Sequence, residues 1–221
     1  MPAIAIPSST ALRDMRARFG VAATLQHALY RLVNTVAFFE WIHIIVLDRA
    51  QVRPPDAARA ERFRARFATL EDLEAMAADP RFAIGPARLE GYRAGESCLL
   101  SYVDDELAGY AWAHDLGRAQ ILPGFVVSVP KQYLYNYAAV TLPQYRGLGL
   151  QPYRHHQLLG SGPWQDKSGL LGFVMHTNFA SRRGQAKSGY RTIGWICLVG
   201  SRRHFRAFFS GSLRRMGIRR L

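Results

Sequence analysis

Two glycines one residue apart, Gly147 and Gly149, follow Arg146 in the stretch YRGLGLQPY, between a strand-like run and a helix-compatible segment. A strand that ends in a tight turn before a helix directs backbone N–H groups into one space, and the helix start adds partial positive charge. Glycine lets the backbone approach a phosphate closely, and the arginine adds a full charge. This corner therefore predicts an anion site suited to a pyrophosphate, although a glycine pair also serves ordinary turns.

The positive charge of the chain is concentrated in its second half. The net charge is +13, and from Leu116 to Leu221 a single acid, Asp166, stands against 16 lysines and arginines. This asymmetry predicts an anionic partner: the phosphates of a cofactor, a nucleic acid, an anionic membrane surface or an acidic carrier protein. The sequence lacks the G-x-x-x-x-G-K-S/T and G-x-G-x-x-G motifs, which argues against a P-loop nucleotidase and a Rossmann enzyme. It also shows no metal-binding spacing of Cys and His.

Residues 59–200 have the pattern of one mixed domain. Strands are expected in FRARF, in a hairpin over SCLLSYVDDELAGYAWAHD, and in FVVSV, QYLYNYAAVTL, LLGFVMHT and TIGWICLVG. Helices are expected after Thr69, which is placed as an N-cap with Asp72 three residues on, and over 82–93, 150–159 and NFASRRGQAKSG. This order predicts an α/β (α+β) domain.

Two segments flank this domain. Residues 1–58 are expected to form an extension that begins with a helix and contains WIHIIVL, which fits a strand or the continuation of that helix. Residues 201–221 hold seven arginines and no acid along an apolar side. This basic amphipathic tail either docks on an anionic membrane or an acidic partner, or packs on its own domain.

The compartment is expected to be cytoplasmic, with the protein peripheral to the inner membrane face if the tail docks there. The N-terminus lacks the order of a secretion signal, and the longest apolar stretch is too short to span a bilayer. Cys98 and Cys197 lie in separate apolar runs, which favours buried thiols over a disulfide.

VTLPQYRGLGL followed by TNFASRRGQAKSGY resembles the GCN5-related N-acetyltransferase (GNAT) family. The pyrophosphate loop of that family usually reads Gln/Arg-x-x-Gly-x-Gly/Ala after the fourth strand. One register uses Gln144, Gly147 and Gly149. A second uses Arg146 and Gly149 with Gln151 in place of the last small residue, and the run PQYRG favours it. The resemblance covers roughly residues 60–200, and its second motif is carried by Asn178, Ser181, Gly189 and Tyr190.

The resemblance implies a GNAT-like fold: a mixed, mostly antiparallel central sheet with flanking helices, and a cleft where strands four and five splay apart. Acetyl-CoA or another acyl-CoA is expected in that cleft, and no metal. The pantetheine arm would pair with the fourth strand at Ala139, Val140 and Thr141, and would lie near Asn178 and Ser181. The pyrophosphate would meet Arg146, Gly147, Leu148, Gly149, Leu150 and Gln151.

The catalytic groups are less clearly marked. Many family members have a tyrosine seven residues after the asparagine as general acid, but this chain has Gln185, which carries no titratable proton. An amine must be neutral to attack a thioester, so a general base or a water chain must remove a proton. The carboxylate candidates are Glu90, Glu96 and Asp115; the other candidate catalytic residues are His114, Tyr135, Tyr137 and His176. Each of these also fits a purely structural role.

The leading hypothesis is an acyl-CoA-dependent N-acyltransferase, most simply an N-acetyltransferase, that transfers the acyl group directly to the amine of a small molecule or peptide. One alternative is an acyltransferase that takes its donor from acyl carrier protein. Another is a noncatalytic module with a degenerate GNAT core that binds a membrane or a nucleic acid, and nucleic acid is the less favoured partner. Residues 1–58 could complete the acceptor pocket, form the face of a homodimer or dock on a membrane enzyme, and the sequence does not rank these three roles.

Overall fold

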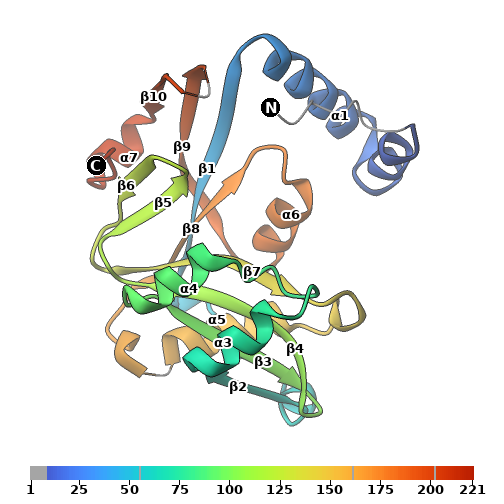
Figure 1. Cartoon of the computed structure of the whole chain (residues 1–221), viewed down its shortest axis with the longest axis vertical. Helices are drawn as coiled ribbons and strands as arrows, with labels where there is room; N and C mark the ends of the chain where they lie inside the picture. The colour runs from blue at the N-terminus through green and yellow to red at the C-terminus, as the bar shows by residue number, and fades with distance from the viewer. Residues whose placement is uncertain (1–8, 55, 161, 202) are drawn as a thin grey trace.

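An eight-stranded sheet forms the centre of the protein in a computed structural model, which describes residues 9–54, 56–160, 162–201 and 203–221 (Figure 1). The strand order is β10-β9-β1-β8-β7-β4-β3-β2, and neighbouring strands are antiparallel except for β7 and β8. The strands are β1 (Phe38–Asp48), β2 (Phe63–Phe67), β3 (Ser97–Val103), β4 (Glu106–His114), β7 (Tyr133–Thr141), β8 (Gly169–Met175), β9 (Arg191–Gly200) and β10 (Phe205–Phe209). The mixed, mostly antiparallel sheet expected from the sequence is confirmed.

Helices cover both faces of this sheet. Leu99 of β3 packs in the cluster that includes Leu158 and Leu159 of α5, whereas its neighbours Cys98 and Leu100 face the cluster of α3. Successive residues of a strand point to opposite faces, so α5 lies on one face and α3 with α4 on the other. The helices are α1 (Ser9–Val36), α2 (Ala57–Ala60), α3 (Leu70–Ala77), α4 (Pro86–Arg93), α5 (Leu150–Gly160), α6 (Phe179–Lys187) and α7 (Gly211–Arg215).

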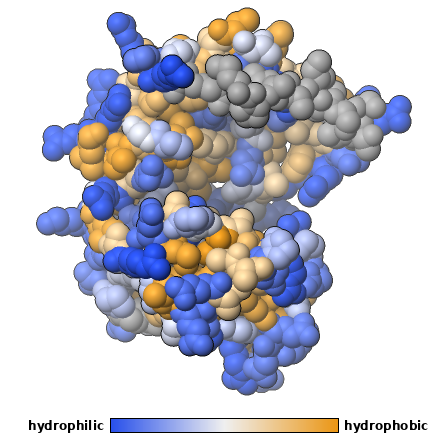
Figure 2. Space-filling view, viewed as in Figure 1, coloured by the Kyte–Doolittle hydropathy of each residue, from blue (hydrophilic) through white to orange (hydrophobic). Residues whose placement is uncertain are grey.

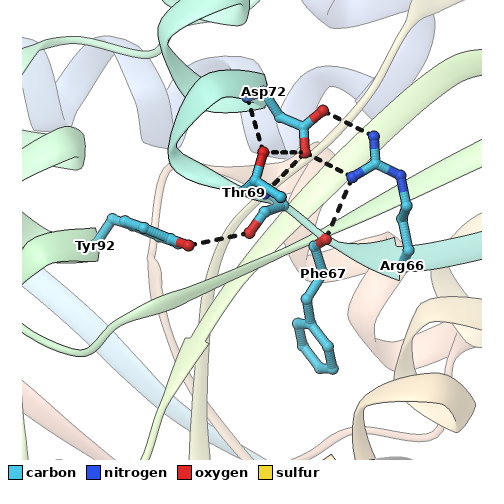
Figure 3. A network of polar contacts seen from close by, with 6 residues as sticks. Arg66, Phe67, Thr69, Asp72 and Tyr92 are labelled. Carbon is cyan, nitrogen blue, oxygen red and sulfur yellow. Dashed lines mark hydrogen bonds and ion pairs between the residues drawn. The ribbon is translucent and has the colours of Figure 1, made fainter.

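The start of α3 has the cap that the sequence predicts (Figure 3). The Thr69 side chain accepts a hydrogen bond from the Asp72 backbone amide, and the Asp72 carboxylate accepts one from the Thr69 amide. Arg66 of β2 forms an ion pair with the same carboxylate, which holds the pKa of Asp72 well below its usual range. This capping box fixes the turn from β2 into α3.

The N-terminal extension supplies a central strand, so the boundary expected at residue 58 does not separate two units of the sheet. β1 pairs with β8 on one side and with β9 on the other. Its residues Ile42, Ile44, Ile45, Val46 and Leu47 are at most 5% exposed. A β-branched run buried on both faces belongs to the core of a sheet. WIHIIVL is therefore a strand, and α1 extends from the body of the protein (Figure 1).

The C-terminal tail packs on its own domain, which was one of the two interpretations of its sequence. β10 pairs with β9, and the side chains of Leu213 and Ile218 are fully buried. They lie against a separate hairpin, β5 (Arg118–Leu122) and β6 (Phe125–Ser128), of which the sequence indicated only the second strand. Part of the apolar side of the tail is thus used inside the protein, while Phe208 is 48% exposed.

Candidate active site

The parallel strands β7 and β8 pair only at their starts and then part. Three residue pairs join them, of which Tyr135 with Leu171 is the last. β7 continues to Thr141 and β8 to Met175, and a cavity of about 860 Å³ opens between the two strands. A recess crosses this side of the molecule between its two halves (Figure 2). β7 and β8 thus correspond to the fourth and fifth strands of the family resemblance, and they splay apart as that resemblance implies.

The edge of β7 beyond the last pair lines this cavity. The predicted pantetheine residues Ala139, Val140 and Thr141 are among the lining residues. Ala138, just before them, has a φ of 46°, and the pairing of β7 with β4 shifts register at this point. A left-handed residue that is not glycine marks a bulge that turns the strand, and such strained positions gather at functional sites. The part of β7 that faces the cavity is therefore free of β8 and bent.

The predicted phosphate loop lies at the same cavity. Gly147 and Gly149 have φ values of 84° and 94°, which only glycine adopts without strain. Arg146, Gly147, Gly149 and Gln151 line the cavity, as does the buried Leu150; neither Gln144 nor Leu148 does. The register of Arg146, Gly149 and Gln151 is thus the one whose three residues all face the cavity.

Positive charge surrounds this end of the cavity. Arg146, Arg154 and Lys187 line it, and no aspartate or glutamate does within the described chain. Arg146 is held by a hydrogen bond that its Nε donates to the carbonyl of Thr141. The surroundings therefore fit the phosphates of a coenzyme A.

Arg154 of α5 is a functional candidate that the sequence analysis missed. Its side chain is 2% exposed and donates hydrogen bonds to the hydroxyls of Ser101 and Thr141, while its Nε lacks a partner within the described chain. Burial lowers the pKa of Arg154 to about 10. A guanidinium in the wall of the cavity without a carboxylate partner adds uncompensated positive charge where an anionic ligand would lie.

The second motif forms the other wall. Asn178 is the N-cap of α6, and its side chain accepts a hydrogen bond from the Ser181 amide at 3.1 Å. Both residues line the cavity. Gln185 lies one turn further along α6 and accepts a hydrogen bond from the Gln151 side chain at 3.0 Å. The hydrogen bond between the two glutamines thus joins α6 to the start of α5, next to the phosphate loop. Neither side chain carries a titratable proton.

Three of the four candidate catalytic residues meet where β7 leaves β8. Tyr137 lies two residues beyond Tyr135 on β7, their rings stack at 4.9 Å, and the Tyr137 hydroxyl donates a hydrogen bond to Oε2 of Glu96. His114 at the end of β4 points its Nε2 toward Oε1 of Glu96 at 3.6 Å. Tyr137 also lines the cavity. We call Glu96, His114, Tyr135 and Tyr137 the apex cluster.

Burial sets the protonation of the apex cluster. It raises the pKa of Tyr137, and the hydrogen bond to Glu96 raises it further, so the phenol keeps its proton near neutral pH. Burial lowers the pKa of His114 despite the nearby carboxylate. The Leu116 amide donates to Nδ1 of His114, which assigns the proton of the neutral ring to Nε2, facing Glu96. Glu96 therefore faces two protonated donors.

A glycine and an arginine on α4 complete this cluster, and the sequence analysis named neither. A Cβ on Gly91 would lie 2.4 Å from Oε2 of Glu96, so a larger residue would displace the carboxylate. The Arg88 guanidinium lies 4.6 Å from the centre of the Tyr137 ring. One helical turn separates Arg88 from Gly91. Their spacing alone does not predict a functional role, because the residues that they contact, Tyr137 and Glu96, lie far away in the sequence or outside the helix.

The remaining candidates lie elsewhere. His176 follows β8, and its ring contacts His43 of β1, with a nitrogen–nitrogen distance of 2.7 Å, and Gln26 of α1. Asp115 forms an ion pair with Lys167 at 3.0 Å, and Glu90 is exposed on α4. The structure therefore gathers Glu96, and not these two carboxylates, with the candidate tyrosines. The described residues include no group of three or more His, Cys, Asp or Glu that could hold a metal ion.

Comparisons with known proteins find structural neighbours at low sequence identity. No family model and no curated protein matches this sequence. A GCN5-related N-acetyltransferase from Kribbella flavida is 16% identical over 95% of this chain and 77% of its own, with a TM-score of 0.47. A Salmonella typhimurium protein solved with acetyl-CoA is 21% identical over 58% of this chain and 79% of its own, with a TM-score of 0.41. A Drosophila protein is 14% identical over 80% of this chain, which spans 57% of it, with a TM-score of 0.46.

Proposed function

We propose that the chain is an acyl-CoA-dependent N-acyltransferase of the GCN5-related type, most simply an N-acetyltransferase. The observation that carries this proposal is the parting of β7 and β8 next to a loop with two left-handed glycines. A bent free strand edge, a phosphate loop and a cationic wall line one cavity, and each suits a different part of an acyl-CoA.

The donor would lie along β7. Beyond Tyr135 this strand has no partner on its β8 side in the described sheet, so the backbone groups of Ala139 to Thr141 are available to the amides of a pantetheine arm. The pyrophosphate would lie against the amides from Gly147 to Gln151, near Arg146. Backbone N–H groups of β7 would polarise the thioester carbonyl.

The apex cluster would handle the protons. The amine nitrogen forms a bond to the acyl carbon as the carbon–sulfur bond breaks. Glu96 does not line the cavity itself, but it contacts Tyr137, which does, and its side chain is 22% exposed, so it would accept the proton that the amine loses. The leaving thiolate takes the Tyr137 proton, which Tyr137 recovers from Glu96. Starting from the neutral amine, this relay accounts for every proton, and it replaces the family's usual acid, since Gln185 has none to give. The hydrogen bond between Tyr137 and Glu96 supports it.

The test is the affinity for coenzyme A and acetyl-CoA, measured by isothermal titration calorimetry on the Gly149→Val variant. Valine at a φ of 94° would distort the loop and block the close approach of a phosphate, so affinity should fall by at least about tenfold. Gly117→Val is the matched control, because Gly117 has a φ of 71° with open space around it, away from the cavity. Equal affinity in the two variants would contradict the assignment of the cleft.

The acceptor is proposed only as an amine on a small molecule or peptide. A screen of amines with the wild-type protein and acetyl-CoA, followed by mass spectrometry of the products, would identify its class. A carrier-protein donor stays a prediction of the sequence, and a turnover that requires acyl carrier protein in place of coenzyme A would establish it.

A further inference from the structure

An apolar stripe runs along α1 on the side that faces away from the protein. Five large residues are exposed there: Val21 by 52%, Leu25 by 66%, Leu29 by 62%, Leu32 by 65% and Val36 by 87%. At 3.6 residues per turn, these positions fall within an arc of about 80°. We call them the α1 stripe. Single exposed leucines are ordinary, but a contiguous stripe of this kind marks a binding surface.

The opposite side of α1 already holds the helix on the protein. Asn34 exchanges hydrogen bonds with the backbone of Phe39, and the Tyr30 ring packs against the Phe39 ring at 6.0 Å. Ala23 is buried. Because these contacts use the inner side, the described residues leave the stripe uncovered. α1 projects from one end of the sheet, where such a partner has access (Figure 1).

The charges around the stripe point to an anionic partner. Between Asp14 and Glu40 the chain has no acid, and Arg31 lies on the same helical segment as the stripe; Arg16 and Arg18 lie before Gly20, whose φ of 86° divides α1 into two segments. The β9–β10 turn lies beside the end of α1, because Phe38 and Phe205 both pair with Gly200. The exposed Arg203 and Arg206 lie in and next to this turn.

We propose that the α1 stripe binds the surface of an anionic lipid membrane, with the segment of α1 that follows the kink at Gly20 lying in the plane of the interface. An amphipathic helix with an apolar face and basic neighbours binds in this way, with its apolar side buried at the level of the headgroups. No helix of the described chain is long and apolar enough to cross a membrane. In the C-terminal tail Leu213 and Ile218 are buried in the domain, and the large apolar residues that are exposed, Phe208 and Leu221, form no such stripe in the described chain.

A second copy of the chain fits the stripe less well. Each copy carries a net charge of +13, and packing α1 against α1 would bring the arginines of both helices together. Like charges across an interface oppose association. An anionic lipid surface meets both features of the helix, the apolar residues and the positive charge.

The test is flotation of the full-length protein with vesicles of phosphatidylglycerol and phosphatidylcholine, compared with vesicles of phosphatidylcholine alone. Wild-type protein should float with the anionic vesicles, and less at high salt. The Leu25→Glu/Leu32→Glu variant should bind at least about tenfold more weakly, because two exposed apolar side chains that would enter the membrane interface become acidic. The Leu116→Glu/Leu221→Glu variant is the control: it changes the charge equally at two exposed leucines outside α1 and should float like the wild type.

Two results would overturn the proposal. One is a wild-type protein that does not float, or an α1 variant that floats as well as the control, with circular dichroism confirming that all variants are folded. The other is a dimer, measured by sedimentation equilibrium, that the α1 variant alone dissociates, which would assign the stripe to a second copy. Neither result depends on acyl transfer, so the proposed function is tested separately.

Discussion

The Tyr137 hydroxyl donates a hydrogen bond to Glu96 two residues beyond the last pair of β7 with β8. Tyr137 lies on the central strand β7, and Glu96 is the residue that precedes β3. Their contact holds a carboxylate against a phenol that lines the cleft where it begins, while Glu96 itself lies outside the lining. A thioester held along β7 would have its reactive carbon near this point, which is why we assign proton transfer to this pair.

Replacing Glu96 should remove turnover and leave donor binding intact. In Glu96→Gln the amide cannot accept the amine proton, so kcat should fall by about 10²- to 10⁴-fold. The affinity for acetyl-CoA should stay within about twofold, because the phosphate loop is unchanged. Steady-state kinetics and calorimetry measure the two quantities. Glu90→Gln, at an exposed carboxylate on α4, is the matched control. Full activity in Glu96→Gln would assign the base elsewhere.

A methyl group on Gly91 should reduce activity while the fold remains stable. The added Cβ of Gly91→Ala would lie 2.4 Å from Oε2 of Glu96, and the flexible carboxylate has to move. Alanine in a helix is better than glycine by up to about 1 kcal/mol, so the melting temperature should not fall. Gly160→Ala in α5, which meets nothing within 4 Å, is the control. A variant with lower stability and unchanged kcat would contradict this role of Gly91.

Local signals in the sequence predicted local structure well. Thr69 and Asp72 specify a cap through groups three residues apart, and the structure contains it. Asp104 and Asp105 mark a hairpin turn, where both residues have positive φ. The glycines of the phosphate loop could be identified for the same reason: the turn they make depends on their own backbone freedom.

Contacts between distant segments could not be predicted from these signals. The run WIHIIVL fits any buried strand, and nothing in its composition specifies a place between β8 and β9. Glu96, His114 and Tyr137 were three separate candidates, because only the pairing of β3, β4 and β7 brings them together. Arg154 and His155 lie in the helix predicted over 150–159, and nothing in that prediction indicated that both would be only 2% exposed.

His155 should make the protein less stable in mild acid. Burial lowers the pKa of His155 to about 3, against about 6.5 in the unfolded chain. The unfolded state therefore binds a proton below pH 6.5 that the folded state does not, so stability falls as the pH falls. Between pH 7 and pH 4 this group should cost about 3 kcal/mol of unfolding free energy.

The measurement is urea unfolding of the wild type and of His155→Gln at several pH values from 7 to 4. The variant should lose less stability over this range, since glutamine does not titrate. His204→Gln, at an exposed histidine in the β9–β10 turn, is the control. Parallel curves for the wild type and His155→Gln would show that the buried ring takes up its proton in the folded protein.

Arg154 should lower the stability of the protein without its ligand. Burial depresses its pKa from 12.5 to about 10, which means that the folded state disfavours the charge that the group carries at pH 7. Its partners do not depend on it: the Ser101 hydroxyl also donates to the Gly109 carbonyl, and Thr141 is half-buried and lines the open cavity. Arg154→Met should therefore raise the free energy of unfolding by about 1–3 kcal/mol, measured by urea unfolding at pH 7.

The control is Arg64→Met, at an exposed ion pair with Asp105, which should change the free energy of unfolding by less than about 0.5 kcal/mol. A less stable Arg154→Met would mean that the two hydroxyl contacts outweigh the cost of burying the charge.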